Sequence, residues 1–125
     1  RFWQSRIGFG MPRLKNVPNG FEIRNPVDDA ALAHIIAALR LYREEDGIVL
    51  STREPRALRA ALLPFGVTQM SAGSKTRPGA YTLGDASGEQ FPVVDERAPF
   101  EVAKELRDLG YDPVWKDWDR GFMSA

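Results

Sequence analysis

The strongest constraint on the fold is the alternation of short apolar segments with helical ones. Residues 7–11, 47–50 and 67–70 have the features of strands, and helical patterns occupy residues 28–42 and 55–65. A helix therefore separates the second strand from the first and the third strand from the second. This order is typical of successive βαβ units, so the sequence predicts an α/β fold with a parallel sheet.

The first helical segment opens at Asp28 and Asp29 and carries one apolar face. The residues of that face recur at helical spacing and are Leu32, Ile35, Ile36, Leu39 and Tyr42. His34, the only histidine of the chain, lies off this face. We therefore expect it to be a solvated helix residue without a catalytic role.

The second strand is apolar without alternation, as expected when both faces of a strand are covered. It is followed at once by the polar residues 51–54. Ser51 and Glu54 have the spacing of a capping box, and Pro55 suits the first turn of a helix, so we expect Ser51 and Glu54 to cap the second helix. The predicted buried face and stop of that helix are Leu58, Ala61, Leu62, Phe65 and then Gly66.

The rest of the chain does not continue this regular alternation of strand and helix. Residues 84–90 are a predicted polar loop, residues 99–109 a third amphipathic helix closed by Gly110, and residues 111–115 a short extended segment. About three parallel strands would leave both edges of a sheet unpaired, and such sheets usually lie inside larger α/β folds. The chain also opens on Arg1 without a start methionine. We therefore expect part of a longer protein, such as the later strands of a (β/α)₈ barrel, with a small three-layer α/β domain as the alternative.

Charge and cysteine content exclude several function classes. The 17 basic and 17 acidic residues cancel, which gives no field for nucleic acid or an anionic membrane. The chain has no cysteine, so it cannot supply a disulfide, a thiolate zinc site or the ligands of an iron–sulfur cluster. No apolar run approaches the length of a membrane span, and no signal-peptide core opens the chain, so we expect a cytoplasmic protein.

Polar residues follow all three predicted strands. Arg13 comes after the first, residues 51–54 after the second and residues 71–76 after the third. In parallel α/β folds ligands bind at the carboxyl ends of the strands. The sequence therefore predicts a small-molecule site at this edge, and its candidate binding residues are Arg53, Ser71, Ser51 and Arg13.

Arg53 is the strongest of these candidates, because its guanidinium fork fits a carboxylate. It could equally pair with a carboxylate of the protein itself, and both roles stay open at this point. Residues 71–76 lack the spacing of a P-loop. The sequence shows no Ser/His/Asp set and no metal-ligand spacing, so we predict binding residues here and no catalytic ones.

Five motifs resemble one enzyme family. They are FWQSRIGFGMPRL (2–14), LSTREP (50–55), FGVTQMSAGSKTRPGAY (65–81), EQF (89–91) and PVWKDWD (113–119). Together they resemble the C-terminal part of the 2-iminoacetate synthases, the tyrosine lyases of bacterial thiamine biosynthesis. Those enzymes are radical S-adenosylmethionine proteins. Ala80 departs from the family, which usually has a second glycine there.

The resemblance implies a partial barrel of the radical S-adenosylmethionine type in residues 1–71 and a C-terminal extension, of the kind associated with biotin and thiamin synthesis, in residues 72–125. It implies cleavage of the Cα–Cβ bond of tyrosine to 2-iminoacetate (dehydroglycine) and p-cresol, with S-adenosylmethionine and a [4Fe–4S] cluster as cofactors. Arg53 would grip the substrate carboxylate beside Ser71, and thiazole synthase is a candidate partner. The family's CxxxCxxC motif is absent from this chain, which is therefore predicted to be inactive alone.

Two relatives and one other class stay open as alternatives. The maturase of the iron-only hydrogenase and the tryptophan lyase of thiopeptide biosynthesis share parts of these motifs. The maturase carries C-terminal cysteines for a second cluster, and their absence here favours the thiamine enzyme. A non-catalytic α/β relic that binds an acidic metabolite or a protein partner is the competing class.

Overall fold

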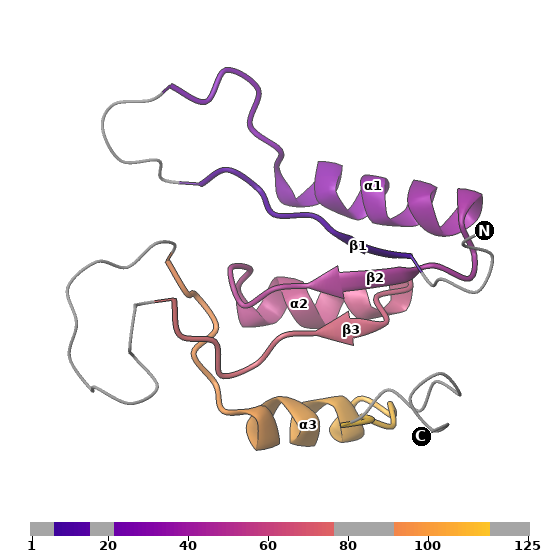
Figure 1. The fold of residues 1–125 in the computed structure, drawn as a ribbon, viewed down its shortest axis with the longest axis vertical. Coiled ribbons are helices and arrows are strands. Elements are labelled where there is room, and N and C mark those ends of the chain that lie inside the picture. Colours follow the sequence, from indigo (N-terminus) through magenta and orange to yellow (C-terminus); the bar gives the residue numbers. More distant parts are fainter. Residues whose placement is uncertain (1–6, 16–21, 77–91, 116–125) are drawn as a thin grey trace, which may run out of the picture.

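The computed structural model describes residues 7–15, 22–76 and 92–115, and these form a parallel sheet with helices packed on it (Figure 1). The strands are β1 (Gly8–Gly10), β2 (Gly47–Leu50) and β3 (Gln69–Met70), in the order β1-β2-β3. Both neighbouring pairs are parallel. The predicted α/β fold with a parallel sheet is therefore confirmed; its extension into a barrel stays a prediction.

The register of the sheet places Phe9 beside Ile48 and Leu50 beside Met70. The first and third strands are each shorter than predicted. Immediately before β3, Thr68 donates its N–H to the carbonyl of Ile48 at 3.0 Å. The sequence pattern therefore located the extended segments, and only their outer residues fall outside the regular ladder.

The core lies where two helices pack on the face of the sheet that carries Ile48 and Leu50. These helices are α1 (Asp29–Tyr42) and α2 (Arg56–Leu62), and α2 continues into the short helix η1 (Leu63–Phe65). The buried cluster consists of Leu32, Ile36, Ile48, Leu50 and Leu62. Burying a side chain of this size stabilises the fold by roughly 1.5–3 kcal/mol. This cluster therefore holds the sheet and the two helices together.

The predicted apolar face of α1 is confirmed at its centre and wrong at its margin. Leu32 and Ile36 are buried, whereas Ile35 is 45% and Tyr42 84% exposed. The sheet of the described residues has three strands, and the central line of side chains on α1 reaches it, whereas the flank and the last turn do not. His34 is exposed, as expected.

The predicted cap of α2 is wrong. Pro55 is the N-cap, and no side chain caps the helix. Glu54 instead turns inward, because it accepts hydrogen bonds from Arg13 and Lys15. The predicted buried face is also wrong in part: Ala61 and Phe65 are exposed, and Arg59 is completely buried.

The predicted stop at Gly66 is confirmed. Its φ of 101° lies in the left-handed region, which favours glycine. A Cβ at this position would lie 2.6 Å from Nε of Arg40. Arg40 donates to the carbonyl of Gly66 at 2.6 Å and to that of Asp46 at 2.9 Å, so it ties the end of α1 to the turn before β3.

The third helix, α3 (Pro99–Asp108), lies alongside β3 and buries Val102 and Ala103 (Figure 1). Gly110, with a φ of 87°, follows its end as predicted. Residues 111–115 form no strand. The polar loop predicted for residues 84–90 lies outside the described residues. No helix in the described ranges is both long enough and apolar enough to cross a membrane.

Candidate functional site

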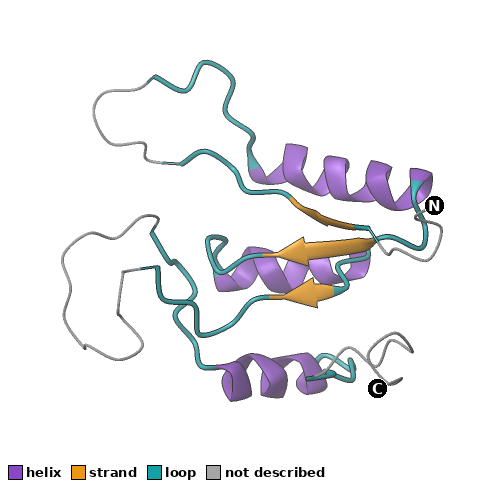
Figure 2. Ribbon diagram, in the orientation of Figure 1, coloured by secondary structure: helices purple, strands orange, loops and turns teal. Residues whose placement is uncertain are grey.

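The loops that follow the three strands come together at one edge of the sheet. In Figure 2 the strand arrows point the same way, and teal loops continue from their tips. All four predicted binding residues, Arg13, Ser51, Arg53 and Ser71, lie in these loops. We call this region the strand-end edge.

A buried ion cluster joins the loops after β1 and β2. Arg13 donates from Nε to Oε1 of Glu54 at 3.0 Å, and its Nη2 contacts Oε2 of the same carboxylate. Lys15 reaches that carboxylate at 2.7 Å, and Asp29 pairs with Nη1 of Arg13 at 2.8 Å. The side chains of Arg13 and Glu54 are only 4% and 3% exposed. We call these residues the Glu54 cluster.

Charge pairing sets the ionisation of this cluster. Burial raises the pKa of Glu54, but the hydrogen bonds from Arg13 and Lys15 outweigh burial and leave that pKa below its usual value. The hydrogen bond to Glu54 raises the pKa of Arg13. Arg13 is thus turned into the protein, and its guanidinium also donates to the carbonyl of Val27 at 3.0 Å.

Arg53 lies directly beside this cluster and is partly exposed. Its Nη2 donates to the carbonyl of Arg13 at 3.2 Å. Its backbone N–H lies 3.3 Å from Oγ of Ser51. The structure therefore brings Arg53, Ser51 and the backbone of Arg13 together, and the guanidinium of Arg13 is bound to Glu54.

A second buried cluster, which sequence reasoning missed, contacts the backbone of Ser71. Arg59 of α2 contacts Asp95 with Nη1 and the carbonyl of Ser71 with Nη2. Arg97 donates to both carboxylate oxygens of Asp95, at 2.7 and 2.6 Å. Glu105 of α3 accepts from Arg97 at 2.6 Å. We call these residues the Asp95 cluster.

The Asp95 cluster is strongly charge-paired. The hydrogen bonds from Arg97, assisted by Arg59, lower the pKa of Asp95 to about 2 although the carboxylate is buried. Burial lowers the pKa of Arg59, and the neighbouring Asp95 opposes that shift. One sequence signal could have found Arg59: it lies three and four residues before the buried Leu62 and Leu63, on the covered side of the helix.

Residues 93–97, which we call the bridging segment, join the loops after β2 and β3. The N–H groups of Val94 and Asp95 donate to the carbonyl of Thr52 at 3.0 and 2.9 Å. At the other end, Gly73 donates its N–H to the carbonyl of Arg97 at 3.0 Å. Gly73 has a φ of 61°, and a Cβ there would approach Cδ of Pro99 to 3.1 Å, so the turn fits closely against the start of α3.

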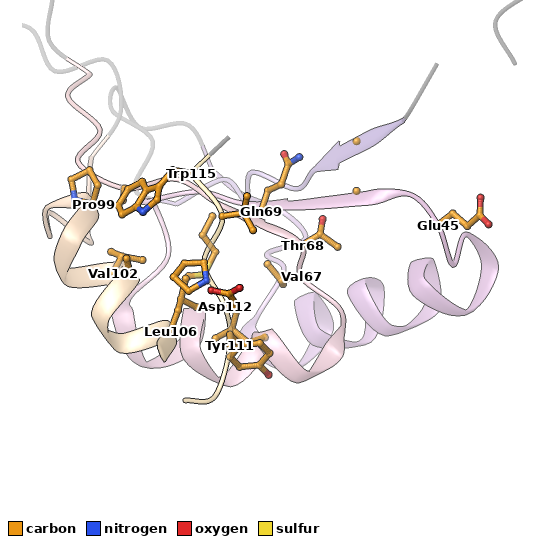
Figure 3. Close-up of a pocket in the computed structure, with 18 of the residues that line it drawn as sticks. Glu45, Val67, Thr68, Gln69, Pro99, Val102, Leu106, Tyr111, Asp112 and Trp115 are labelled. Carbon is orange, nitrogen blue, oxygen red and sulfur yellow. The ribbon is translucent and has the colours of Figure 1, made fainter. Parts of the chain in front are cut away.

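A cavity of about 1040 Å³ lies between β3, α3 and residues 111–115 (Figure 3). Gln69, Val102, Leu106 and Trp115 are among its lining residues. None of the four predicted binding residues lines it. Ala72, in the loop after β3, also lines the cavity, so the cavity reaches the strand-end edge without including the four candidates.

An iron–sulfur cluster, which the family resemblance implies, does not fit the residues of this chain. The sequence contains no cysteine, and thiolates are the usual ligands of such clusters. Among the described residues, no group of three or more His, Asp or Glu side chains could hold a metal ion. What the strand-end edge offers is an arginine, two serines and backbone groups, which suit recognition of a carboxylate-bearing small molecule.

Two curated relatives align with most of this sequence. The chain is 41% identical over 118 residues to 2-iminoacetate synthase of Escherichia coli (strain K12) and, equally, to that of Salmonella typhimurium (strain LT2). Each match covers 94% of this chain and 31% of the relative. The chain thus spans about a third of the length of these relatives. The resemblance noted in the sequence is confirmed.

Solved structures of hydrogenase maturases are similar in fold. The FeFe-hydrogenase maturase HydG from Carboxydothermus hydrogenoformans superposes with a TM-score of 0.74 at 37% identity, over 89% of this chain and 25% of that chain. A second structure of HydG gives 0.67 at 34% identity, over 73% of this chain and 19% of that one.

The sequence also matches the Biotin and Thiamin Synthesis associated domain over residues 10–112. This match extends to both sides of residue 71, and the predicted division of the chain at that position stays a prediction. Because the match covers well over half of the chain, the protein belongs to the Biotin and Thiamin Synthesis associated domain family.

Proposed function

We propose that this chain is the substrate-binding C-terminal part of a 2-iminoacetate synthase. The complete enzyme would cleave the Cα–Cβ bond of tyrosine to 2-iminoacetate and p-cresol, and so supply the thiazole of thiamine. The observation that carries this proposal is the 41% identity to two 2-iminoacetate synthases across 94% of the chain. The parallel sheet would form the last strands of the enzyme's barrel.

Arg53 grips the carboxylate of the amino acid in this proposal. It lies at the strand-end edge, and its planar fork of N–H donors matches a carboxylate. The hydroxyls of Ser51 and Ser71, both partly buried in the same loops, supply neighbouring hydrogen-bonding groups. Arg13 contributes through its carbonyl, which accepts from Arg53, while its guanidinium binds Glu54.

The role of these residues is positioning. A substrate held at its carboxylate presents one chosen bond to the reacting centre, and such orientation contributes several kcal/mol to catalysis. S-adenosylmethionine and a [4Fe–4S] cluster would supply the radical chemistry, with the cluster ligands provided by residues that this chain does not contain. No residue of this chain is assigned a catalytic role.

The test is p-cresol formation from tyrosine by the complete enzyme loaded with its cofactors. We expect p-cresol from the unaltered enzyme, and a KM for tyrosine at least tenfold higher for Arg53→Lys, which keeps the charge and loses the bidentate fork. Asp108→Asn, on the exposed side of α3, is the control and should leave KM unchanged. Failure of the loaded enzyme to release p-cresol would contradict the proposal.

The likeness to HydG favours hydrogenase maturation as a second candidate function. Complementation separates the two: rescue of a strain that lacks its own 2-iminoacetate synthase supports the lyase, and rescue of hydrogenase maturation supports the alternative.

A further inference from the structure

The loops that carry Arg53 and Ser71 are held by one shared segment. The carbonyl of Thr52, the residue before Arg53, accepts the N–H groups of both Val94 and Asp95. The carbonyl of Ser71 accepts from Arg59, whose other terminal nitrogen contacts the carboxylate of Asp95. The backbone of Asp95 is therefore fixed to one loop, and its side chain is fixed, through Arg59, to the other.

The carboxylate of Asp95 is what aligns Arg59. The side chain of Arg59 is completely buried, and within the described part of the chain its Nε has no hydrogen-bond partner. An apolar side chain could fill this volume without the cost of burying a charge. An arginine held by Asp95 does something that an apolar residue cannot do: it directs a hydrogen-bond donor at the Ser71 carbonyl.

We propose that Asp95 is a positioning residue for substrate binding, which sets the spacing between the Arg53 loop and the Ser71 loop through its backbone N–H and through Arg59. This inference rests on the proposed function, because it assumes that these two loops bind the amino acid. It goes further in assigning a role at the site to a residue that contacts no substrate. The bridging segment thereby becomes part of the binding site.

The matched control is Glu105. It belongs to the same network, and its side-chain hydrogen bonds among the described residues go to Arg97 and Arg56, so Glu105→Gln should loosen α3 without a direct change to either loop. Asp95→Asn removes the charge that holds Arg59 and keeps the shape of the side chain. Both variants are made in the complete enzyme. Tyrosine binding is measured by calorimetry, and steady-state KM and kcat are measured beside it.

We expect Asp95→Asn to weaken tyrosine binding about tenfold, the size of effect that follows from disturbing one charge-assisted hydrogen bond at the site. Its KM should rise by a similar factor, with a smaller change in kcat. Glu105→Gln should change tyrosine affinity less than twofold. A large loss of tyrosine affinity in Asp95→Asn beside a small one in Glu105→Gln would support the proposal, because a purely structural role predicts similar effects on affinity for both variants.

Other outcomes would overturn it. If the unaltered enzyme binds tyrosine and Arg53→Lys weakens binding while folded Asp95→Asn does not, the positioning role is wrong and the proposed function stands. If the unaltered enzyme binds no tyrosine, the proposed function itself fails, and this inference with it. Equal losses of affinity in Asp95→Asn and Glu105→Gln would also reject the positioning role.

A second variant covers the case in which Asp95→Asn does not fold. Arg97→Gln removes two hydrogen bonds to the Asp95 carboxylate and leaves the Arg59 contact in place. It also removes the contact of Arg97 with Glu105, so Glu105→Gln remains its control. We expect Arg97→Gln to weaken tyrosine binding about threefold more than Glu105→Gln does. Equal affinities of the two variants would reject the positioning role.

Discussion

The Glu54 cluster and the Asp95 cluster use the same chemistry at the same edge of the sheet, and they differ in what they connect. The Glu54 cluster joins two adjacent strand ends, and the partly exposed Lys15 and the exposed Asp29 add to it. The Asp95 cluster joins strand ends to a later part of the chain, through Arg59, which is completely buried. A cluster with several partners can lose one and remain paired, whereas Arg59, which pairs with one carboxylate in the described part of the chain, cannot.

The largest expected effect is therefore on the Asp95 cluster. Asp95→Ala should lower the free energy of unfolding by about 3–5 kcal/mol, because Arg59 would be left as an unpaired buried charge. Denaturant unfolding followed by circular dichroism would measure this loss. Asp95→Glu, which keeps the charge, should recover part of it. A loss below about 1 kcal/mol for Asp95→Ala would mean that Arg59 finds another partner.

The corresponding change in the Glu54 cluster should cost less. Glu54→Gln should lower the free energy of unfolding by roughly 1–3 kcal/mol, because Arg13 keeps Asp29 and the Val27 carbonyl as partners. The double variant Glu54→Gln/Asp29→Asn should lower the free energy of unfolding by more than the sum of the two single variants. In each single variant the remaining carboxylate still pairs with Arg13, and in the double variant neither does. Additive losses in this double-mutant cycle would contradict that redundancy.

Lowering the pH should remove the stabilisation that the Asp95 carboxylate gives to its cluster. The pKa of Asp95 is lowered from 3.8 to about 2, so its contribution to stability is complete above about pH 4 and is lost as pH falls toward 2. The contribution is about 2 kcal/mol. The difference in the free energy of unfolding between the unaltered protein and Asp95→Asn should therefore shrink over this range. A difference that stays constant from pH 5 to pH 2 would be inconsistent with the lowered pKa.

The smallest effect belongs to an exposed pair. Lys104 and Asp108 form an i,i+4 pair in α3 at 2.7 Å, with side chains 76% and 62% exposed. Asp108→Ala should change the free energy of unfolding by less than about 0.5 kcal/mol, because water and salt screen such a pair. Thermal melts at low and high salt would test this. A loss comparable with that of Glu54→Gln would show that burial is not what distinguishes these pairs.

The sequence predicted what depends on local pattern. The strand–helix order, the glycine stops at Gly66 and Gly110, and the gathering of polar residues at the strand-end edge follow from periodicity and from the geometry of parallel sheets. The role of Glu54 could not be predicted in this way, since capping-box spacing also suits a carboxylate that turns inward. The Asp95 cluster was missed because the partner of Arg59 lies 36 residues away. No local pattern carries that information.

The pairing of Arg59 with Asp95 also bears on how such proteins can be recombined. A chimaera of two relatives joined at residue 71 would take Arg59 from one parent and Asp95 from the other. The hydrogen bonds from Val94 and Asp95 to Thr52 would cross the same junction. A junction that keeps residues 52–97 in one piece would inherit both ends of each contact from a single parent, so the smallest exchangeable unit is larger than the division at residue 71 suggests.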